Sequence, residues 1–180
     1  MVESEDGGNL TVAMERKIYF SLLEDLDLKW VKEIYDYYIL NSTAIYYTEL
    51  QTEEDIRRIL PMDNPPYKAY AIRDEKGIPL GFCYYGPYSE REAYQVTVEI
   101  TIYLRPECVG HHIGMQVMDR LEADIRKNKF RNIVSLVDSE NVASCRLMEK
   151  AGFVCCGIIR NVAEKFGRKC SLSIYQKELQ

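Results

Sequence analysis

The chain has 180 residues, of which 47% are hydrophobic and 28% charged, enough apolar sequence for a folded domain with a buried core. Its formal net charge of -5 argues against binding to nucleic acid or to an anionic membrane surface, since both attract basic proteins. No apolar run approaches the roughly 20 residues that span a bilayer, and the acidic first residues carry no basic and apolar signal region. We therefore expect a cytoplasmic protein with no membrane or nucleic-acid partner.

The hydrophobic pattern predicts strands and helices along residues 16–180, which we expect to form a single domain behind a disordered lead at residues 1–15. In chain order the predicted elements are a strand at 17–21, a helix from Asp25 or Asp27 to about Leu40, a short helix after Thr52, strands at 69–73, 80–85 and 95–104, a helix at 113–127, a strand at 133–137, a helix at 142–151, and strands at 153–159 and 172–177. At least six strands mixed with helices indicate an α/β or α+β sheet packed with helices.

The six cysteines are not arranged as a disulfide framework or a metal site. They have no paired C-x-x-C spacing, and half of them fall inside apolar stretches. We expect reduced, mostly buried thiols.

The segment from Arg105 to Gly114 joins the strongest predicted strand to an amphipathic helix. The start of such a helix presents unpaired backbone N–H groups and the positive end of the helix dipole, which together suit a phosphate. The first turn of this helix, residues 114–117, carries no acid that would repel an anion. Taken alone, the pattern fits a simple tight turn between strand and helix better than a ligand site.

A second segment, residues 141–153, follows about 30 residues later, after another strand. With both segments in place, the sequence resembles the GNAT superfamily and, within it, the phosphinothricin acetyltransferase family. Further similar segments are Ile34-Tyr35, 41–44 with Glu49, 91–94, 97–99, and Arg160 followed by 165–167. The similarity extends over roughly residues 17–178.

The resemblance implies a GNAT fold, in which a mixed central sheet flanked by helices has one pair of parallel strands that splays apart around acetyl-CoA. The cofactor-binding residues that it implies are Ile102, Tyr103 and Leu104 for the pantetheine, the backbone of Val109, Gly110, His111, His112, Ile113 and Gly114 for the pyrophosphate, and Asn141 and Ser144 beside them. Asn141 is equally explained as a helix N-cap. The resemblance also implies a homodimer. The two adjacent histidines are the only ones in the chain and no third ligand is spaced to join them, so we expect no metal.

Glu99 lies on the polar face of the strand at 95–104, a few residues before the expected thioester position. An amine is protonated at neutral pH and must lose a proton before it attacks a thioester. A glutamate whose pKa is raised by partial burial could accept that proton directly or through a water. Without the resemblance, Glu99 would be interpreted as a solvated strand charge. With it, we expect Glu99 to be the general base of a direct attack without an acyl-enzyme.

Three positions depart from the family pattern. The phosphate loop usually has Gln or Arg at the position of Val109 and a small residue at that of His112, so the loop here is bulkier. Met148 stands where a Tyr or His commonly protonates the leaving thiolate. A thiol with a pKa of about 8.5 still leaves tolerably as thiolate near neutral pH. Lys169 and Ser171 replace a Trp and an Asp beside the acceptor pocket, so the usual substrate does not carry over directly.

The acceptor is the least constrained part of the prediction. Family members acetylate phosphinothricin, methionine sulfone or related amino-acid analogues, and Arg91, Tyr94 and Lys165 could bind a carboxylate or phosphinate here. Each of the three is explained as well by surface salt bridges, and the tyrosines between positions 35 and 47 by core packing. The alternatives are acetylation of another amine, such as a polyamine or a protein N-terminus, and a degenerate domain that only binds CoA.

Overall fold

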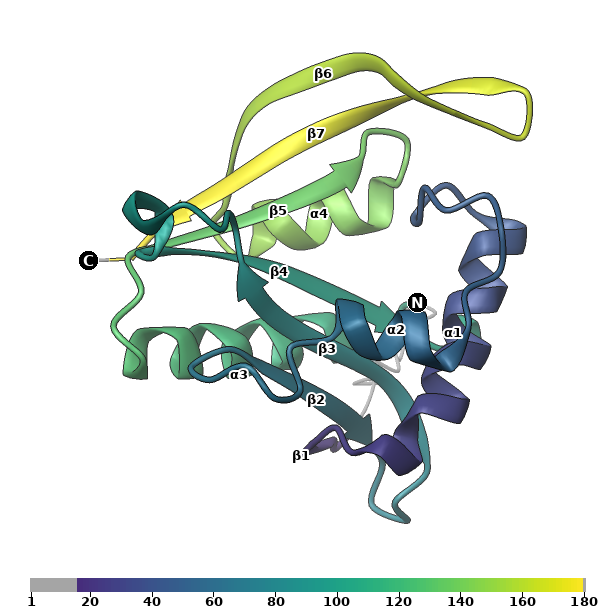
Figure 1. Ribbon diagram of the computed structural model, residues 1–180, viewed down its shortest axis with the longest axis vertical. Coiled ribbons are helices and arrows are strands. Elements are labelled where there is room, and N and C mark those ends of the chain that lie inside the picture. Colours follow the sequence, from purple (N-terminus) through teal and green to yellow (C-terminus); the bar gives the residue numbers. More distant parts are fainter. Residues whose placement is uncertain (1–15, 180) are drawn as a thin grey trace, which may run out of the picture.

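The computed structural model describes residues 16–179, so the predicted lead at residues 1–15 lies outside the described part of the chain. The strands and helices, in chain order, are β1 (Tyr19–Leu22), α1 (Leu28–Asn41), α2 (Glu53–Ile59), β2 (Lys68–Arg73), β3 (Pro79–Pro87), β4 (Thr97–Leu104), α3 (Ile113–Lys127), β5 (Asn132–Asp138), α4 (Val142–Lys150), β6 (Val154–Lys165) and β7 (Arg168–Glu178), as Figure 1 shows. Short 3-10 turns occupy Asp25–Asp27, Glu92–Tyr94 and Pro106–Cys108. None of the helices in the described residues has the length and apolar character needed to cross a membrane.

The strands form a single seven-stranded mixed sheet in the order β1-β2-β3-β4-β5-β7-β6. Among the described strands, β4 and β5 are the only parallel neighbours, and every other neighbouring pair is antiparallel. The parallel pair is connected through α3, as a parallel crossover requires. This confirms the predicted mixed α/β sheet.

The parallel pair splays apart, as expected. Residues 97–99 of β4 pair with residues 132–134 of β5, and the pairing then stops. Beyond this point β4 continues along β3 as far as Leu104, while β5 continues along β7 as far as Asp138. The two strands therefore diverge into a fork, which is visible in Figure 1.

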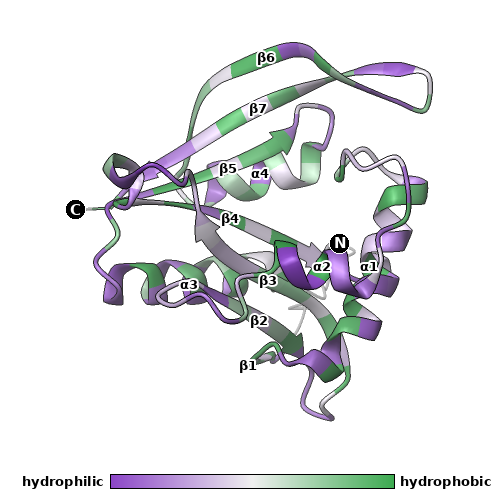
Figure 2. Cartoon of the chain, viewed as in Figure 1, coloured by the Kyte–Doolittle hydropathy of each residue, from purple (hydrophilic) through white to green (hydrophobic). Residues whose placement is uncertain are grey.

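Helices cover both faces of the sheet. Val31, Ile34 and Ile39 of α1 pack with Ile56 of α2 and Phe82 of β3 in one hydrophobic cluster. A larger cluster joins α3 and the inner side of α4 to the opposite face. Figure 2 shows hydrophobic and hydrophilic residues alternating around these helices, so that each has one apolar stripe to bury.

Local signals account for several element ends. Thr52 accepts a hydrogen bond from the backbone N–H of Asp55, whose carboxylate accepts one from the N–H of Thr52, which forms a capping box at the start of α2. Gly152 follows α4 with φ of 82°, a conformation that glycine adopts at little cost.

The C-terminal strands are longer than the predicted 153–159 and 172–177. They extend to a tight hairpin whose two central residues, Phe166 and Gly167, both have positive φ, the geometry of a two-residue turn. Most of β6 is exposed, so its outer half carries no alternation of buried and polar residues from which its length could be predicted.

Candidate active site

Glu99 stands at the base of the fork. It is the last residue of β4 that pairs with β5, opposite Val134, and on its other side it pairs with Gly86 of β3. The side chain is half-buried, and this burial raises the pKa of Glu99 above its ordinary value. A carboxyl group with a raised pKa holds a proton more readily, which suits a base that must accept one from an amine.

Hydroxyl groups lie on the same face of the sheet as Glu99. Thr101 is two residues further along β4, so its side chain projects to the same side, and it pairs with Tyr84 of β3. The Tyr84 hydroxyl is hydrogen-bonded to Thr101 and to Tyr35 of α1. Burial is the main cause that raises the pKa of both tyrosines, so both remain neutral hydroxyls at neutral pH. The carboxylate therefore shares this face of the sheet with hydroxyl groups that lie within a mainly aromatic layer.

The tyrosines between positions 35 and 47 divide between packing and pocket lining. Tyr35 is buried and its ring stacks on Phe82 at 5.6 Å, which fits the core interpretation. Tyr38 lines a pocket at the open end of the fork and donates a hydrogen bond of 2.8 Å to the carbonyl of Leu104. Burial raises the pKa of Tyr38 to about 12. Tyr37 and Tyr47 are exposed.

Beyond Glu99, alternate backbone groups of β4 point into the fork. The N–H of Arg105 donates to the carbonyl of Leu80 at 2.7 Å, on the β3 side. Since successive residues of a strand alternate in the direction of their hydrogen bonds, Tyr103 also bonds toward β3, while Ile102 and Leu104 point toward β5. β5 does not pair there, so the N–H groups of these two residues face the fork.

The loop before α3 presents a helix start without a side-chain cap. Gly110 has φ of 86° and His112, the N-cap residue, has φ of 59° in the left-handed region. The His112 side chain makes no capping hydrogen bond, and the first turn of α3 contains no acid. The N–H groups at this end of the helix are therefore available to an anion. The bulkier residue at position 112 adopts a conformation that a small glycine would adopt with less strain.

Other residues of this loop divide between the pocket and the core. Val109 is 47% exposed and lines the pocket at the fork, His111 is exposed, and Ile113 is buried, so that only its backbone could meet a ligand. A Cβ added to Gly114 would lie 3.0 Å from the side chain of Leu147, so this glycine permits the close approach of α3 to α4.

The pocket at the fork has a volume of about 490 Å³. It is lined by Tyr38, Asn41, Ser42, Thr43, Val109, Glu140, Asn141, Ala143, Ser144 and Arg168. It thus brings the end of α1, the loop before α3 and the start of α4 together. Asn141 caps α4, because its side-chain oxygen accepts a hydrogen bond from the N–H of Ser144 at 3.1 Å. The N-cap interpretation of Asn141 is therefore confirmed, and its other side-chain group remains on the pocket wall.

Met148 is buried in the core beneath α4. Its thioether has no proton to donate, so Met148 cannot protonate a leaving thiolate.

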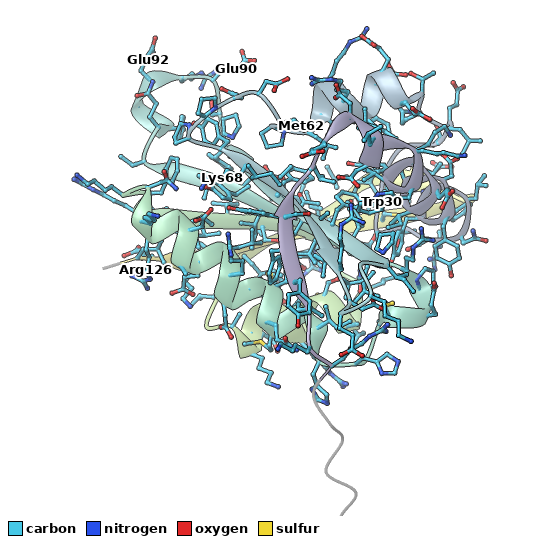
Figure 3. All side chains as sticks on the ribbon, turned by 90° about the horizontal axis from the view of Figure 1, so that it is seen from below. Trp30, Met62, Lys68, Glu90, Glu92 and Arg126 are labelled. Carbon is cyan, nitrogen blue, oxygen red and sulfur yellow. The ribbon has the colours of Figure 1, made fainter. Side chains whose placement is uncertain are left out.

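Arg91 and Tyr94 lie in the connection between β3 and β4, and both are exposed. The Tyr94 ring packs edge-on against Tyr88 at 5.5 Å. Figure 3 shows Glu90 and Glu92 of this connection on the side of the sheet that carries α2, while Arg126 of α3 lies on the other side. The connection therefore flanks the face on which Glu99 lies.

Lys165 differs from the expectation of a substrate-binding cation. Its side chain is 4% exposed, and its ammonium donates to the carbonyls of Ser42 at 2.7 Å, Ile45 at 2.6 Å and Tyr38 at 3.5 Å. These carbonyls lie at and just beyond the end of α1, where an ammonium group satisfies unpaired acceptors. Burial lowers the pKa of Lys165. The residue connects the tip of the β6–β7 hairpin to the loop after α1.

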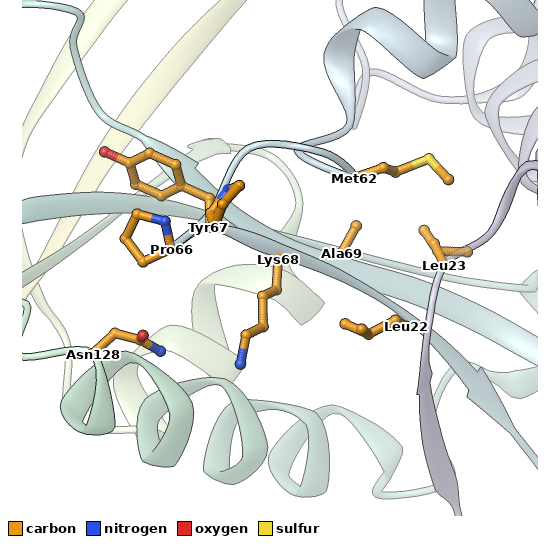
Figure 4. Close-up of a pocket in the computed structure, with 9 residues that line it drawn as sticks. Leu22, Leu23, Met62, Pro66, Tyr67, Lys68, Ala69 and Asn128 are labelled. Carbon is orange, nitrogen blue, oxygen red and sulfur yellow. The ribbon is translucent and has the colours of Figure 1, made fainter.

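A second pocket, of about 510 Å³, lies at the β1–β2 edge of the sheet, away from the fork. Leu22, Met62 and Pro66 form part of its apolar wall, and the side chain of Lys68 extends toward α3 (Figure 4). The ammonium of Lys68 is paired with Asp124 at 3.0 Å. This pocket contains none of the residues that the sequence marked.

Sequence reasoning missed Tyr84 and Gly86, which the pairing of β3 with β4 places beside Glu99. The strand predicted at 80–85 stops one residue before Gly86, whereas β3 extends to Pro87, so the signal of a glycine inside a strand was missed. Within residues 16–179, no group of three or more His, Cys, Asp or Glu side chains is placed to hold a metal ion.

Comparison with known proteins agrees with this geometry. Residues 31–153 match the acetyltransferase (GNAT) family. The chain is 28% identical to a phosphinothricin N-acetyltransferase of Alcaligenes faecalis, over 88% of this chain and 81% of that protein, and 31% identical to an L-methionine sulfoximine/L-methionine sulfone acetyltransferase of Pseudomonas aeruginosa, over 85% and 90%. A solved GNAT-superfamily phosphinothricin acetyltransferase from Sinorhizobium meliloti, in complex with AcCoA, superposes with a TM-score of 0.85 at 26% identity, covering 90% of this chain and 88% of that one. The protein is thus an acetyltransferase that belongs to the GNAT family and is related to the phosphinothricin N-acetyltransferases.

Proposed function

We propose that the protein transfers the acetyl group of acetyl-CoA to the primary amine of a small amino acid or amino-acid analogue, of the phosphinothricin or methionine sulfone type. The observation that carries this proposal is the half-buried carboxylate of Glu99 at the base of the fork, beside strand backbone that has no partner in the sheet. The relatives of known activity act on acceptors of this kind, as their names state.

Acetyl-CoA fits the fork by its chemistry. The pantetheine amides would pair with the backbone of β4 at Ile102–Leu104, and the pyrophosphate would lie on the N–H groups from Val109 to Gly114. Asn141 and Ser144, on the pocket wall, would contact the cofactor near its entry.

Glu99 accepts the proton of the bound ammonium, either directly or through a water, and the free amine attacks the thioester carbonyl. The oxyanion that develops accepts a hydrogen bond from one fork-facing N–H of β4, that of Ile102 or that of Leu104, while the pantetheine pairs with the other. The tetrahedral intermediate then collapses with cleavage of the C–S bond, and the second proton of the amine nitrogen passes to the departing CoA thiolate or to water, which leaves the neutral N-acetyl product. No acid at position 148 protonates the leaving thiolate. The thiolate can still leave near neutral pH, because the thiol pKa is about 8.5.

Arg91 and Tyr94 are the groups that we propose for recognition of the acid function of the acceptor. Both are exposed and flank the face of the sheet that carries Glu99. Lys165 is not included, since its ammonium is buried against backbone carbonyls.

We further propose a homodimer in the cytoplasm. Support for the dimer comes from β6, an edge strand whose Val154, Ile158 and Val162 are all exposed, since an apolar edge of this kind favours pairing with another chain. The six cysteines are free thiols, which is typical of a reducing compartment.

The test follows release of free CoA thiol from acetyl-CoA with a panel of amines, comprising phosphinothricin, L-methionine sulfone, spermidine and a peptide with a free N-terminus. Glu99→Gln is compared with Glu164→Gln, which changes an exposed strand glutamate of β6. We expect amino-acid analogues to accelerate release, a loss of about 10²- to 10⁴-fold in Glu99→Gln, and no change in the control.

Different results would favour the alternatives. A preference for spermidine or for the peptide would replace the proposed acceptor. If acetyl-CoA binds and no amine accelerates thiol release, the protein is a binding module. If Glu99→Gln equals the wild type at every pH, Glu99 is not the base.

A further inference from the structure

Gly86 lies in β3 within an uninterrupted ladder. Its neighbours Tyr85 and Pro87 pair in register with β4, and Gly86 itself pairs with Glu99. The residue is buried. A glycine in the interior of a strand weakens the strand by roughly 0.5–1 kcal/mol relative to alanine, so its presence there calls for a physical reason.

The usual reasons do not apply to Gly86. Its φ is not in the left-handed region, in contrast to that of Gly110 or Gly167. The ladder has no bulge at this position. Close approach of another chain segment is also excluded, because a Cβ added to Gly86 would meet no atom within 4 Å apart from those of its chain neighbours.

Two other glycines show what a packing constraint looks like in this fold. A Cβ on Gly81, in the same strand, would overlap the carbonyl oxygen of Tyr103. A Cβ on Gly114 would lie 3.0 Å from the side chain of Leu147. At both positions the protein itself occupies the space that a side chain would need, whereas at Gly86 the space is empty.

This empty space adjoins the Glu99 side chain. Residues that pair directly across an antiparallel ladder project to the same face, with their Cβ positions about 4.5–5.5 Å apart. The position that a Gly86 side chain would occupy is therefore beside Glu99, and Tyr84 and Thr101 border the same part of the face.

We propose that Gly86 forms the floor of the acceptor site and sets the size of the acceptor, because the substituent on the amine-bearing carbon lies in the space over Gly86 while the amine meets Glu99. This inference rests on the proposed function and adds a specificity-determining residue to it. It explains why a glycine is present at position 86 although neither the conformation of the backbone nor packing within the protein requires one. The ligand occupies the volume that a side chain would otherwise fill.

The experiment compares Gly86→Ala and Gly86→Val with Gly157→Val. Gly157 is the control, because it is also a strand glycine without positive φ, it also has no atom within 4 Å of an added Cβ, and it lies on β6 at the far edge of the sheet; it differs from Gly86 in lying at a register shift between β6 and β7. Steady-state kinetics are measured with glycine, L-alanine, L-methionine sulfone and phosphinothricin as acceptors, and the melting temperature and the KM for acetyl-CoA are measured for every variant.

Both Gly86 variants are expected to fold, because the added side chain extends into open space, and valine also suits a strand. Gly86→Val is expected to lower kcat/KM for methionine sulfone and phosphinothricin by about 10- to 200-fold more than for the smallest acceptor used, with an unchanged KM for acetyl-CoA. Gly86→Ala is expected to lower kcat/KM by a smaller factor, which again increases with the size of the acceptor. If the valine variant does not fold, the alanine variant provides the test. Gly157→Val is expected to match the wild type.

Two results would overturn the inference while the proposed function stands. One is an acceptor profile of the Gly86 variants that equals that of the wild type. The other is a loss of the same factor for every acceptor, which would indicate a general disturbance of β4. If the wild type binds acetyl-CoA but uses no amine, the proposed function fails and the inference fails with it, and this result is seen before any variant is compared.

Discussion

Replacing Lys165 with methionine removes an ammonium group from the end of α1 and keeps a flexible side chain of similar length. Two carbonyl oxygens, those of Ser42 and Ile45, accept short hydrogen bonds of 2.7 and 2.6 Å from this ammonium. The third, that of Tyr38, is 3.5 Å away and contributes little. The side chain is buried, so water does not readily replace the lost donor.

The magnitude follows from the two short hydrogen bonds. A buried acceptor that loses its partner costs about 1–3 kcal/mol, so two of them predict a loss of roughly 2–6 kcal/mol in the free energy of unfolding. For a protein of this size, each kcal/mol corresponds to about 2–4 °C, so the melting temperature is expected to fall by roughly 4–24 °C. The loss is expected at the lower end if water enters the site.

Urea unfolding followed by circular dichroism measures the change, with Lys169→Met as the matched control. Lys169 is an exposed residue of β7, close to the same hairpin, and its replacement is expected to change stability by no more than about 0.5 kcal/mol. If Lys165→Met is as stable as the wild type, while the KM for acceptors that carry a carboxylate rises tenfold, the ammonium contacts the substrate and does not support α1.

Three further predictions concern packing, capping and pH. Gly81→Ala is expected to destabilise the protein by about 1–3 kcal/mol in urea unfolding, because its Cβ would overlap the carbonyl oxygen of Tyr103. Gly86→Ala is not expected to destabilise it. If the two variants are equally stable, the close approach of β3 to β4 at Gly81 is contradicted. Asn141→Ala is expected to cost about 1 kcal/mol through loss of the cap on α4 and to raise the KM for acetyl-CoA; an unchanged KM would limit Asn141 to capping. The kcat/KM for the acceptor is expected to rise with pH through an apparent pKa above the ordinary glutamate range, and this limb is expected to disappear in Glu99→Gln.

The pKa of Glu99 has a consequence for stability that is separate from activity. Because burial raises this pKa in the folded state, ionisation of Glu99 weakens folding above the folded-state pKa, and the penalty is absent below the unfolded value of about 4.3. Glu99→Gln is therefore expected to melt at a higher temperature than the wild type at neutral pH, with the difference vanishing as the pH falls below about 4. Melting curves across this range test the prediction, and a variant less stable at neutral pH would contradict it.

The strands and helices could be predicted from the sequence wherever they depend on the order of neighbouring residues. The alternation along residues 97–104 placed Glu99 on a polar strand face, and the apolar periodicity of residues 113–127 predicted α3 with its bounds. The loop before α3 is predicted to hold a phosphate only through the family resemblance, because its local pattern alone fits a tight turn better. The strand pattern repeats every two residues and the helix pattern every 3.6, so a short window of sequence is enough to detect either.

Which residues lie next to one another across the sheet became clear from the fold alone. Gly86 stands beside Glu99 through the register of β3 with β4, and register depends on pairing across the sheet that no local pattern specifies. Lys165 was expected to be a substrate-binding cation, and it is buried because the β6–β7 hairpin ends against the last carbonyls of α1. The burial of a lysine depends on what another segment places over it, so the sequence around Lys165 could not predict it.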